Sequence, residues 1–177
     1  MNVKRALNDF YTQHGYGLEG GIHKKWAMIK FGPVAVPLPN LKSRRKHVYL
    51  HDINHLVTGY DVSWLGESSV ASWQIATGGW GRFYFMWLIS LQAMAIGVML
   101  YTRQSYRAFQ AGLRMKNALT GGLTKQEMYR LSVDELRLRL QRTGSEFVQR
   151  SYVIWAGLSL LVYWSPFIIG FVLYRLL

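Results

Sequence analysis

The feature that most constrains this chain is an uncharged apolar run near its end, from Tyr152 to Tyr174. As an α-helix this run would extend about 35 Å, slightly more than the hydrocarbon thickness of a bilayer. Tyrosine and tryptophan lie near its ends, and Arg150 and Arg175 bracket it, as is typical of a membrane-spanning helix. The run therefore predicts a C-terminal transmembrane helix. Pro166 predicts a kink in it, with a re-entrant hairpin as the alternative.

A second uncharged run, from Phe83 to Tyr101, would be about 28 Å long as a helix. Residues 1–82 and residues 102–150 each contain ten lysines and arginines. If the run crossed the bilayer, one of these two basic regions would lie outside, which the positive-inside rule opposes. The sequence therefore favours 83–101 as an apolar core helix or a shallowly inserted helix, continuing into residues 102–119. A two-span hairpin is the alternative.

Composition and charge fit a membrane protein with one helical domain. The net charge is +12, half of the residues are hydrophobic, and there is no cysteine for disulfides. The basic charge alone would also suit a nucleic-acid binder, but no recognition fold is apparent, so we expect no nucleic-acid partner. The predicted fold is mainly α: a cytoplasmic-face helical domain at 1–145 and an anchor at 146–177. We expect the inner (cytoplasmic) membrane, with the main domain on its cytoplasmic side and no export signal.

Local patterns predict most of the elements of the main domain. Helical spacing and capping residues indicate helices over Asn2–Gln13, Ser43–Thr58 and Ser132–Arg142, the last with a capping box formed by Ser132 and Glu135. A further helix is expected after Glu67, ending at Gly78. Two short extended pieces around Gly32 and Pro33 predict at most a small hairpin.

The polar residues that suggest chemistry are concentrated between His51 and Glu67. His51 and His55 are four residues apart, so on a helix they share one face and can bind one ion. Asp52 flanks that face, and Gly59 predicts a turn that lets Glu67 approach from a second element. Imidazole and carboxylate ligands suit a divalent metal, with zinc the first choice and iron, cobalt or manganese the alternatives. The competing interpretation is a set of ordinary solvated or hydrogen-bonded side chains.

The same residues carry a resemblance to a known family. HDINH, then eleven residues, then Glu67, with LVTGYD after the second histidine, is similar to the signature of the coenzyme Q biosynthesis protein 4 family. PNLKSRRKHVYLHD upstream and LSVDELRLRLQ downstream extend the resemblance over roughly residues 16–141. It implies that His51, Asp52, His55 and Glu67 are the metal ligands, and that an apolar groove binds a quinone or isoprenoid intermediate.

Two functions follow as expectations. The first is a ubiquinone-biosynthesis protein that assists decarboxylation or hydroxylation of a quinone-precursor ring, or that scaffolds the enzymes doing so. In that role Tyr60 is a candidate hydrogen-bond donor to the substrate, unless its hydroxyl is satisfied locally. The alternative is a non-catalytic subunit of a photosynthetic or respiratory membrane complex that has co-opted this fold. Both expect membrane lipid and other membrane-protein subunits as partners.

Overall fold

The structure is a computed structural model that describes residues 1–31, 34–143 and 151–176. Its elements are α1 (Val3–Gln13), the 3-10 turn η1 (Leu18–Gly21), β1 (Trp26–Phe31), β2 (Val34–Pro39), α2 (Lys42–Thr58), α3 (Trp64–Thr77), α4 (Tyr84–Leu100), α5 (Thr102–Leu113), α6 (Lys125–Arg130), α7 (Val133–Arg139) and α8 (Tyr152–Leu176). The mainly helical fold predicted from the sequence is confirmed.

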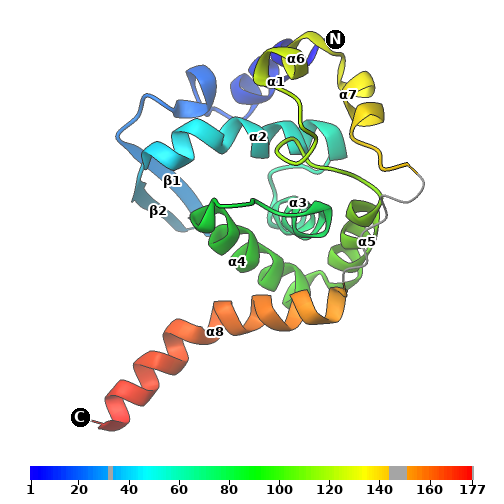
Figure 1. Cartoon of the computed structure of the whole chain (residues 1–177). Coiled ribbons are helices and arrows are strands. Elements are labelled where there is room, and N and C mark those ends of the chain that lie inside the picture. Colours follow the sequence, from blue (N-terminus) through cyan, green and yellow to red (C-terminus); the bar gives the residue numbers. More distant parts are fainter. Residues whose placement is uncertain (32–33, 144–150, 177) are drawn as a thin grey trace.

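Helix α3 lies at the centre of the molecule. Figure 1 views it almost along its axis, with α2 on one side, α4 and α5 on the other, and α8 beyond them. Helices α1 and α7 cover the side of α2 that faces away from α3, and α6 packs on α1. One apolar cluster joins α1, α2, α6 and α7 to α3, and a second joins α3, α4, α5 and α8. Since α3 belongs to both clusters, it ties the two halves of the domain together.

Helix α3 begins earlier than the sequence predicts. Ser63 caps it by accepting a hydrogen bond from the Gly66 amide at 3.2 Å, so the helix starts at Trp64 and includes Glu67 in its first turn. The negative charge of a carboxylate in the first turn also interacts favourably with the positive end of the helix dipole. Helix α3 ends before Gly78, as predicted. From Ser68 to Thr77 every residue is buried.

The chain bends between α4 and α5 and does not continue as the single helix expected from the sequence. Tyr101 leaves the helical conformation, with φ −136° and ψ 41°, and α5 folds back onto α3. The two helices approach closely at Gly112, where any side chain would collide with the backbone oxygen of Trp73. The bend thus gives α3 two neighbours, α4 and α5, on the side opposite α2.

The smaller predictions are confirmed with changes at their ends. Strands β1 and β2 pair antiparallel with Ile29 opposite Val36, and the residues of their turn lie outside the described chain. The capping box of Ser132 and Glu135 is formed. Helix α7 stops at Arg139, short of the predicted Arg142. The residues that follow it instead make backbone hydrogen bonds to residues 114–116, as in the bond that Lys116 N–H donates to the Leu140 carbonyl at 2.7 Å.

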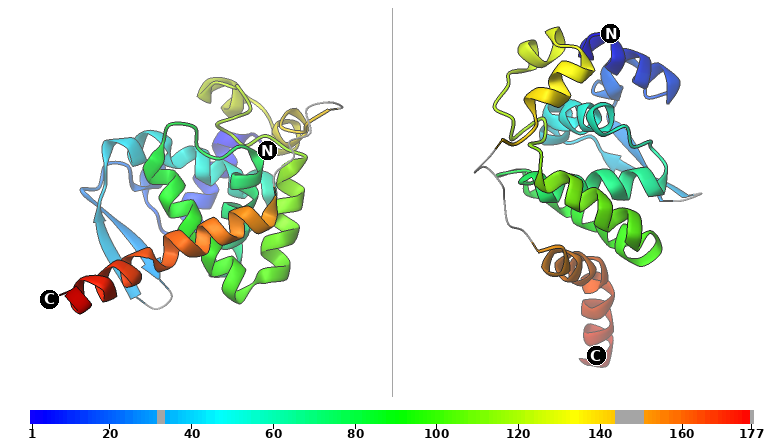
Figure 2. Two further views of the ribbon diagram at one scale, coloured as in Figure 1. Left: turned by 60° about the horizontal axis from the view of Figure 1, so that its bottom comes forward. Right: turned by 90° about the vertical axis from the view of Figure 1, so that its right-hand side faces the viewer.

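Helix α8 is long and apolar enough to cross a membrane. Only 11 % of the most apolar 18-residue stretch of α8 is buried, whereas the core helix of a soluble protein is mostly buried. Its first half packs on α4, and its C-terminal half extends away from the domain (Figure 2). Helix α8 continues through Pro166, so the re-entrant hairpin is not formed. The predicted boundary between residues 145 and 146, like Arg150, lies outside the described residues.

Candidate metal centre

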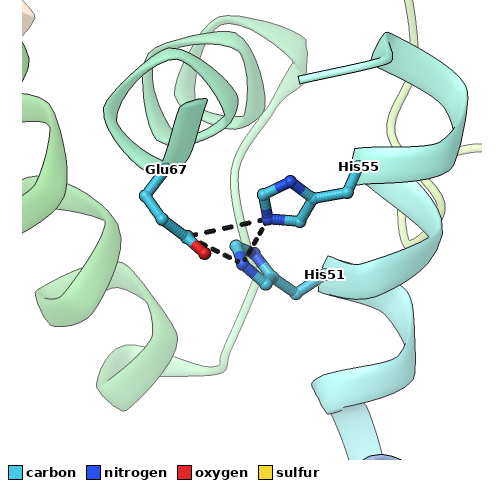
Figure 3. A group of neighbouring side chains, drawn as sticks. All are labelled: His51, His55 and Glu67. Atoms are coloured by element: carbon cyan, nitrogen blue, oxygen red, sulfur yellow. Dashed lines mark hydrogen bonds and ion pairs between the residues drawn. The ribbon is translucent and has the colours of Figure 1, made fainter. Parts of the chain in front are cut away.

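Helix α2 presents His51 and His55 from one face, one turn apart. The helix ends at Gly59, which adopts the left-handed conformation at φ 77° and donates its N–H to the His55 carbonyl at 2.8 Å. Glycine adopts this conformation without a steric penalty, which is why the helix stops here. Both imidazole rings point toward α3, as Figure 3 shows.

Glu67 points back from the first turn of α3 and completes a triangle of ligand atoms. Its Oε2 lies 3.3 Å from Nε2 of His51 and 3.6 Å from Nε2 of His55. The two Nε2 atoms are 3.1 Å apart. The side chain of His55 is 1 % exposed and that of Glu67 is 31 % exposed, so the group lies at the edge of the interior with one side open.

The triangle has the size that a small divalent cation requires. The point in its plane equidistant from the three atoms lies about 1.9 Å from each, close to the length of a zinc–nitrogen or zinc–oxygen bond. Two neutral imidazoles and one carboxylate also form a donor set used by catalytic zinc and by iron enzymes. His51, His55 and Glu67 can therefore hold a metal ion.

The outer nitrogen of each imidazole is held by a second group. Nδ1 of His55 lies 2.9 Å from the Tyr60 carbonyl, which can only accept, so Nδ1 carries a proton; in the neutral ring Nε2 therefore offers its lone pair to the triangle, and in the protonated ring Nε2–H faces Glu67. Nδ1 of His51 lies 3.1 Å from the Gln74 amide. Partners of this kind fix the tautomer and the ring orientation of metal-binding histidines.

Gln74 is the functional residue that the sequence analysis missed. It is fully buried in α3, and its Oε1 is the one buried side-chain polar atom without a hydrogen-bond partner within the described ranges. Turning the amide by half a rotation places Oε1 against Nδ1–H of His51, the arrangement needed when Nε2 of His51 binds an ion. The signal was present, because Gln74 follows Glu67 by seven residues and therefore shares its helix face.

Replacing Gln74 with leucine is expected to lower metal affinity by about 10- to 100-fold, because the acceptor that holds the His51 ring is lost. Isothermal titration of the full chain in detergent with zinc would measure this. Gln110→Leu on the exposed surface of α5 is the matched control and should bind as the wild type does. Gln74→Glu keeps an acceptor and should restore affinity. A Gln74→Leu variant that is folded and binds with unchanged affinity would contradict the role.

Electrostatics keeps Glu67 ionised. Burial by itself would raise the pKa of Glu67, but hydrogen bonds from His51 and His55 and their charges outweigh burial and hold the pKa well below its usual range. For His51 burial opposes the charged form, yet the hydrogen bond to Glu67 and the charges of Glu67 and Asp52 leave the pKa raised. Glu67 therefore gives the site a permanent negative charge. Protons and a metal ion compete for His51.

Asp52, predicted as a fourth ligand, is placed elsewhere. Its Oδ2 accepts a hydrogen bond from the hydroxyl of Tyr11 on α1 at 2.9 Å, and the pair is buried. One residue along a helix turns the side chain by about 100°, which directs Asp52 toward α1 and not toward α3. Burial raises the pKa of Asp52, while His51 and the Tyr11 hydrogen bond lower it in part. The structure thus brings together three of the four predicted ligands.

Tyr60 contributes through its backbone as well as its ring. Its carbonyl holds His55, as described above, and its side chain lines a cavity of about 370 Å³ with Asp61, Ser69 and Arg107. Burial raises the pKa of the Tyr60 phenol, so the hydroxyl stays protonated and can donate a hydrogen bond. The predicted substrate role of Tyr60 therefore has a cavity beside it, and it stays a prediction.

No family model matches this chain, and no curated protein or solved structure matches it.

Proposed function

We propose that this protein is a membrane-associated metal protein that acts on a quinone precursor, in the manner of the coenzyme Q biosynthesis protein 4 family that its HDINH motif resembles. The observation that carries the proposal is the convergence of His51, His55 and Glu67 from two helices, with Nδ1 of each histidine held from behind. Metal-binding histidines almost always donate their other ring N–H to a partner of this kind, which fixes the tautomer and the ring orientation.

The bound ion would polarise a carboxylate or phenolate oxygen on the precursor ring, or activate oxygen or water. Replacing a ring carboxylate with a hydroxyl group releases CO2 and consumes dioxygen, three protons and two electrons from a reductant, with water as the other product. Zinc has no redox chemistry and supports polarisation only, whereas iron also supports oxygen activation. The identity of the metal therefore separates a direct oxidative role from an assisting one.

The location and partners follow the same proposal. Helix α8 anchors the chain, and the basic domain faces the cytoplasmic surface of the inner membrane, where anionic lipids attract lysine and arginine. Quinone and isoprenoid intermediates are themselves dissolved in that membrane. The protein then meets its ligand, and the enzymes that modify the ligand, at the bilayer surface.

A second candidate function is favoured by one observation, the long uncovered apolar surface of α8. Such a helix can pack between other membrane proteins, and the chain would then be a non-catalytic subunit of a photosynthetic or respiratory complex. In that case the three ligands would brace α2 against α3 and need no open coordination position.

The experiment that tests the proposal is a gentle detergent extraction from the native membrane. Metal content, extracted quinones and co-purifying subunits are measured on the same preparation, and a prenylated hydroxybenzoate is then supplied with dioxygen and a reductant. We expect about one ion per chain and metal-dependent CO2 release, by the chain itself or by enzymes that it retains. A metal-free chain in fixed ratio with partner subunits would overturn the proposal and favour the second candidate.

A further inference from the structure

Helix α4 has an apolar face that the other described elements cover only in part, with Phe85 and Ala93 packed against the core at its edges. Tyr84, Leu88, Met99 and Leu100 are exposed, and the half-buried Phe85, Ile89, Ala93 and Ile96 lie between them on the same side of the helix. Gln92 is the polar residue of this face. The opposite side of α4, with Met94 fully buried, packs against α3. Helix α4 is thus a core helix on one side and a partly uncovered apolar surface on the other.

This face adjoins the apolar surface of α8. The rings of Trp87 and Trp155 stack with centroids 5.4 Å apart and an interplanar angle of 12°. Leu91 and Ala156 belong to the same buried cluster. The side of α8 that faces away from α4 is apolar and exposed even where the two helices are in contact, at Val153, Ile154 and Leu161. The two surfaces therefore form one continuous patch.

The charges beside this patch fit a lipid surface. Helix α4 contains no aspartate, glutamate, lysine, arginine or histidine, while Arg82 before it and Arg103 after it are both exposed. An apolar segment flanked by arginines suits a bilayer, whose hydrocarbon excludes charge and whose anionic headgroups attract it. At about 25 Å, α4 is shorter than a typical transmembrane helix.

We propose that α4 is inserted in the bilayer beside α8, so that the two helices together form the membrane face of the protein. The partner is the lipid bilayer itself. The inserted face of α4 contacts hydrocarbon, Arg82 and Arg103 contact anionic headgroups, and the domain is held flat against the membrane and not suspended from one helix. This inference needs no metal and goes beyond the proposed function.

The chain has no cysteine, so single cysteines can report the depth of chosen positions. Four exposed leucines form a matched set: Leu88 and Leu100 on α4, Leu161 on α8 and Leu138 on α7, between 47 % and 68 % exposed. Each is replaced with cysteine in the full chain, labelled with a nitroxide and reconstituted in phosphatidylcholine vesicles containing some phosphatidylglycerol. Collision with oxygen, which concentrates in lipid, is compared with collision with a water-soluble nickel chelate.

We expect the labels at Leu88, Leu100 and Leu161 to collide with oxygen and be protected from nickel, and the label at Leu138 to show the reverse. If both α4 labels behave like Leu138, α8 alone enters the bilayer and the proposal is overturned. If they are protected from both reagents, protein covers the face, as a second copy or another subunit would, and the proposal is overturned as well. Circular dichroism and the spectrum of each label in detergent verify that the variants are folded.

Discussion

Replacing Glu67 with glutamine is expected to lower metal affinity by more than about 100-fold, beyond the loss typical of outer partners such as Gln74. The amide keeps the size of the side chain but removes the permanent negative charge that faces two imidazoles at 3.3 Å and 3.6 Å. Without that charge, the site offers two neutral nitrogens to a divalent cation. Equilibrium dialysis of the full chain in detergent, with the metal measured by mass spectrometry, gives the affinity and the stoichiometry.

The surface of the same protein supplies the control. His23 and Glu19 form a second histidine–glutamate pair, also at 3.3 Å, but both side chains are well exposed. His23→Ala should leave metal binding unchanged, because an exposed pair lacks a third ligand and buried support. A Glu67→Gln variant that binds as tightly as the wild type, or a His23→Ala variant that loses its ion, would show that the ion is held elsewhere.

The pH dependence of binding gives an independent check on the same site. The metal needs the deprotonated form of His51, whose pKa is raised, whereas Glu67 stays ionised because its pKa is lowered. As the pH falls below the pKa of His51, protons displace the metal and the affinity falls by up to tenfold per pH unit for each proton released. In Glu67→Gln the hydrogen bond and charge that raise the His51 pKa are gone, so this fall should shift to lower pH.

Replacing Asn117 with alanine is expected to lower the free energy of unfolding by about 3–4 kcal/mol, at roughly 1 kcal/mol per lost hydrogen bond. The Asn117 amide is buried and makes four hydrogen bonds. Its Nδ2 donates to Thr77 Oγ1 at 2.8 Å and to the Gly79 carbonyl at 3.0 Å, and its Oδ1 accepts from the amides of Leu119 and Thr120. It therefore fastens the loop after α5 to the end of α3.

A comparison of two substitutions separates the halves of this network. Asn117→Asp keeps the acceptor for the loop amides but loses both donors and places a carboxylate beside the Gly79 carbonyl, so it should be at least as destabilising as alanine. Asn8→Ala on the exposed side of α1 is the control and should change stability by less than about 0.5 kcal/mol. Denaturation in detergent, followed by circular dichroism, measures all three. A loss below 1 kcal/mol for Asn117→Ala would contradict the network.

The sequence predicted the parts of the site that depend on local geometry. Four-residue spacing placed His51 and His55 on one face, and Gly59 marked the end of their helix, because both follow from backbone conformation alone. The start of α3 was predicted too late, since the Ser63 cap was not recognised, although Glu67 was still chosen.

Contacts between distant segments could not be predicted in this way. Asp52 was assigned to the metal because nothing in its neighbourhood reveals Tyr11, which lies 41 residues earlier and meets it only when α1 packs on α2. The bend at Tyr101 was missed for a similar reason. The apolar run continues into an amphipathic one without a breaker, and the packing of α5 on α3, through Gly112, decides the turn.

The burial of α3 on all sides has a mechanical consequence. From Ser68 to Thr77 the helix has no free surface, and a closely packed rod cannot move toward one neighbour without opening a gap against another. Its α2 side carries Glu67 and Gln74, and its other side rests on α4. With α4 inserted in the bilayer as proposed above, lateral pressure on α4 would be transmitted to the helix that sets the spacing between Glu67 and the two imidazoles, and the thickness of the bilayer would then be coupled to the tightness of ion coordination.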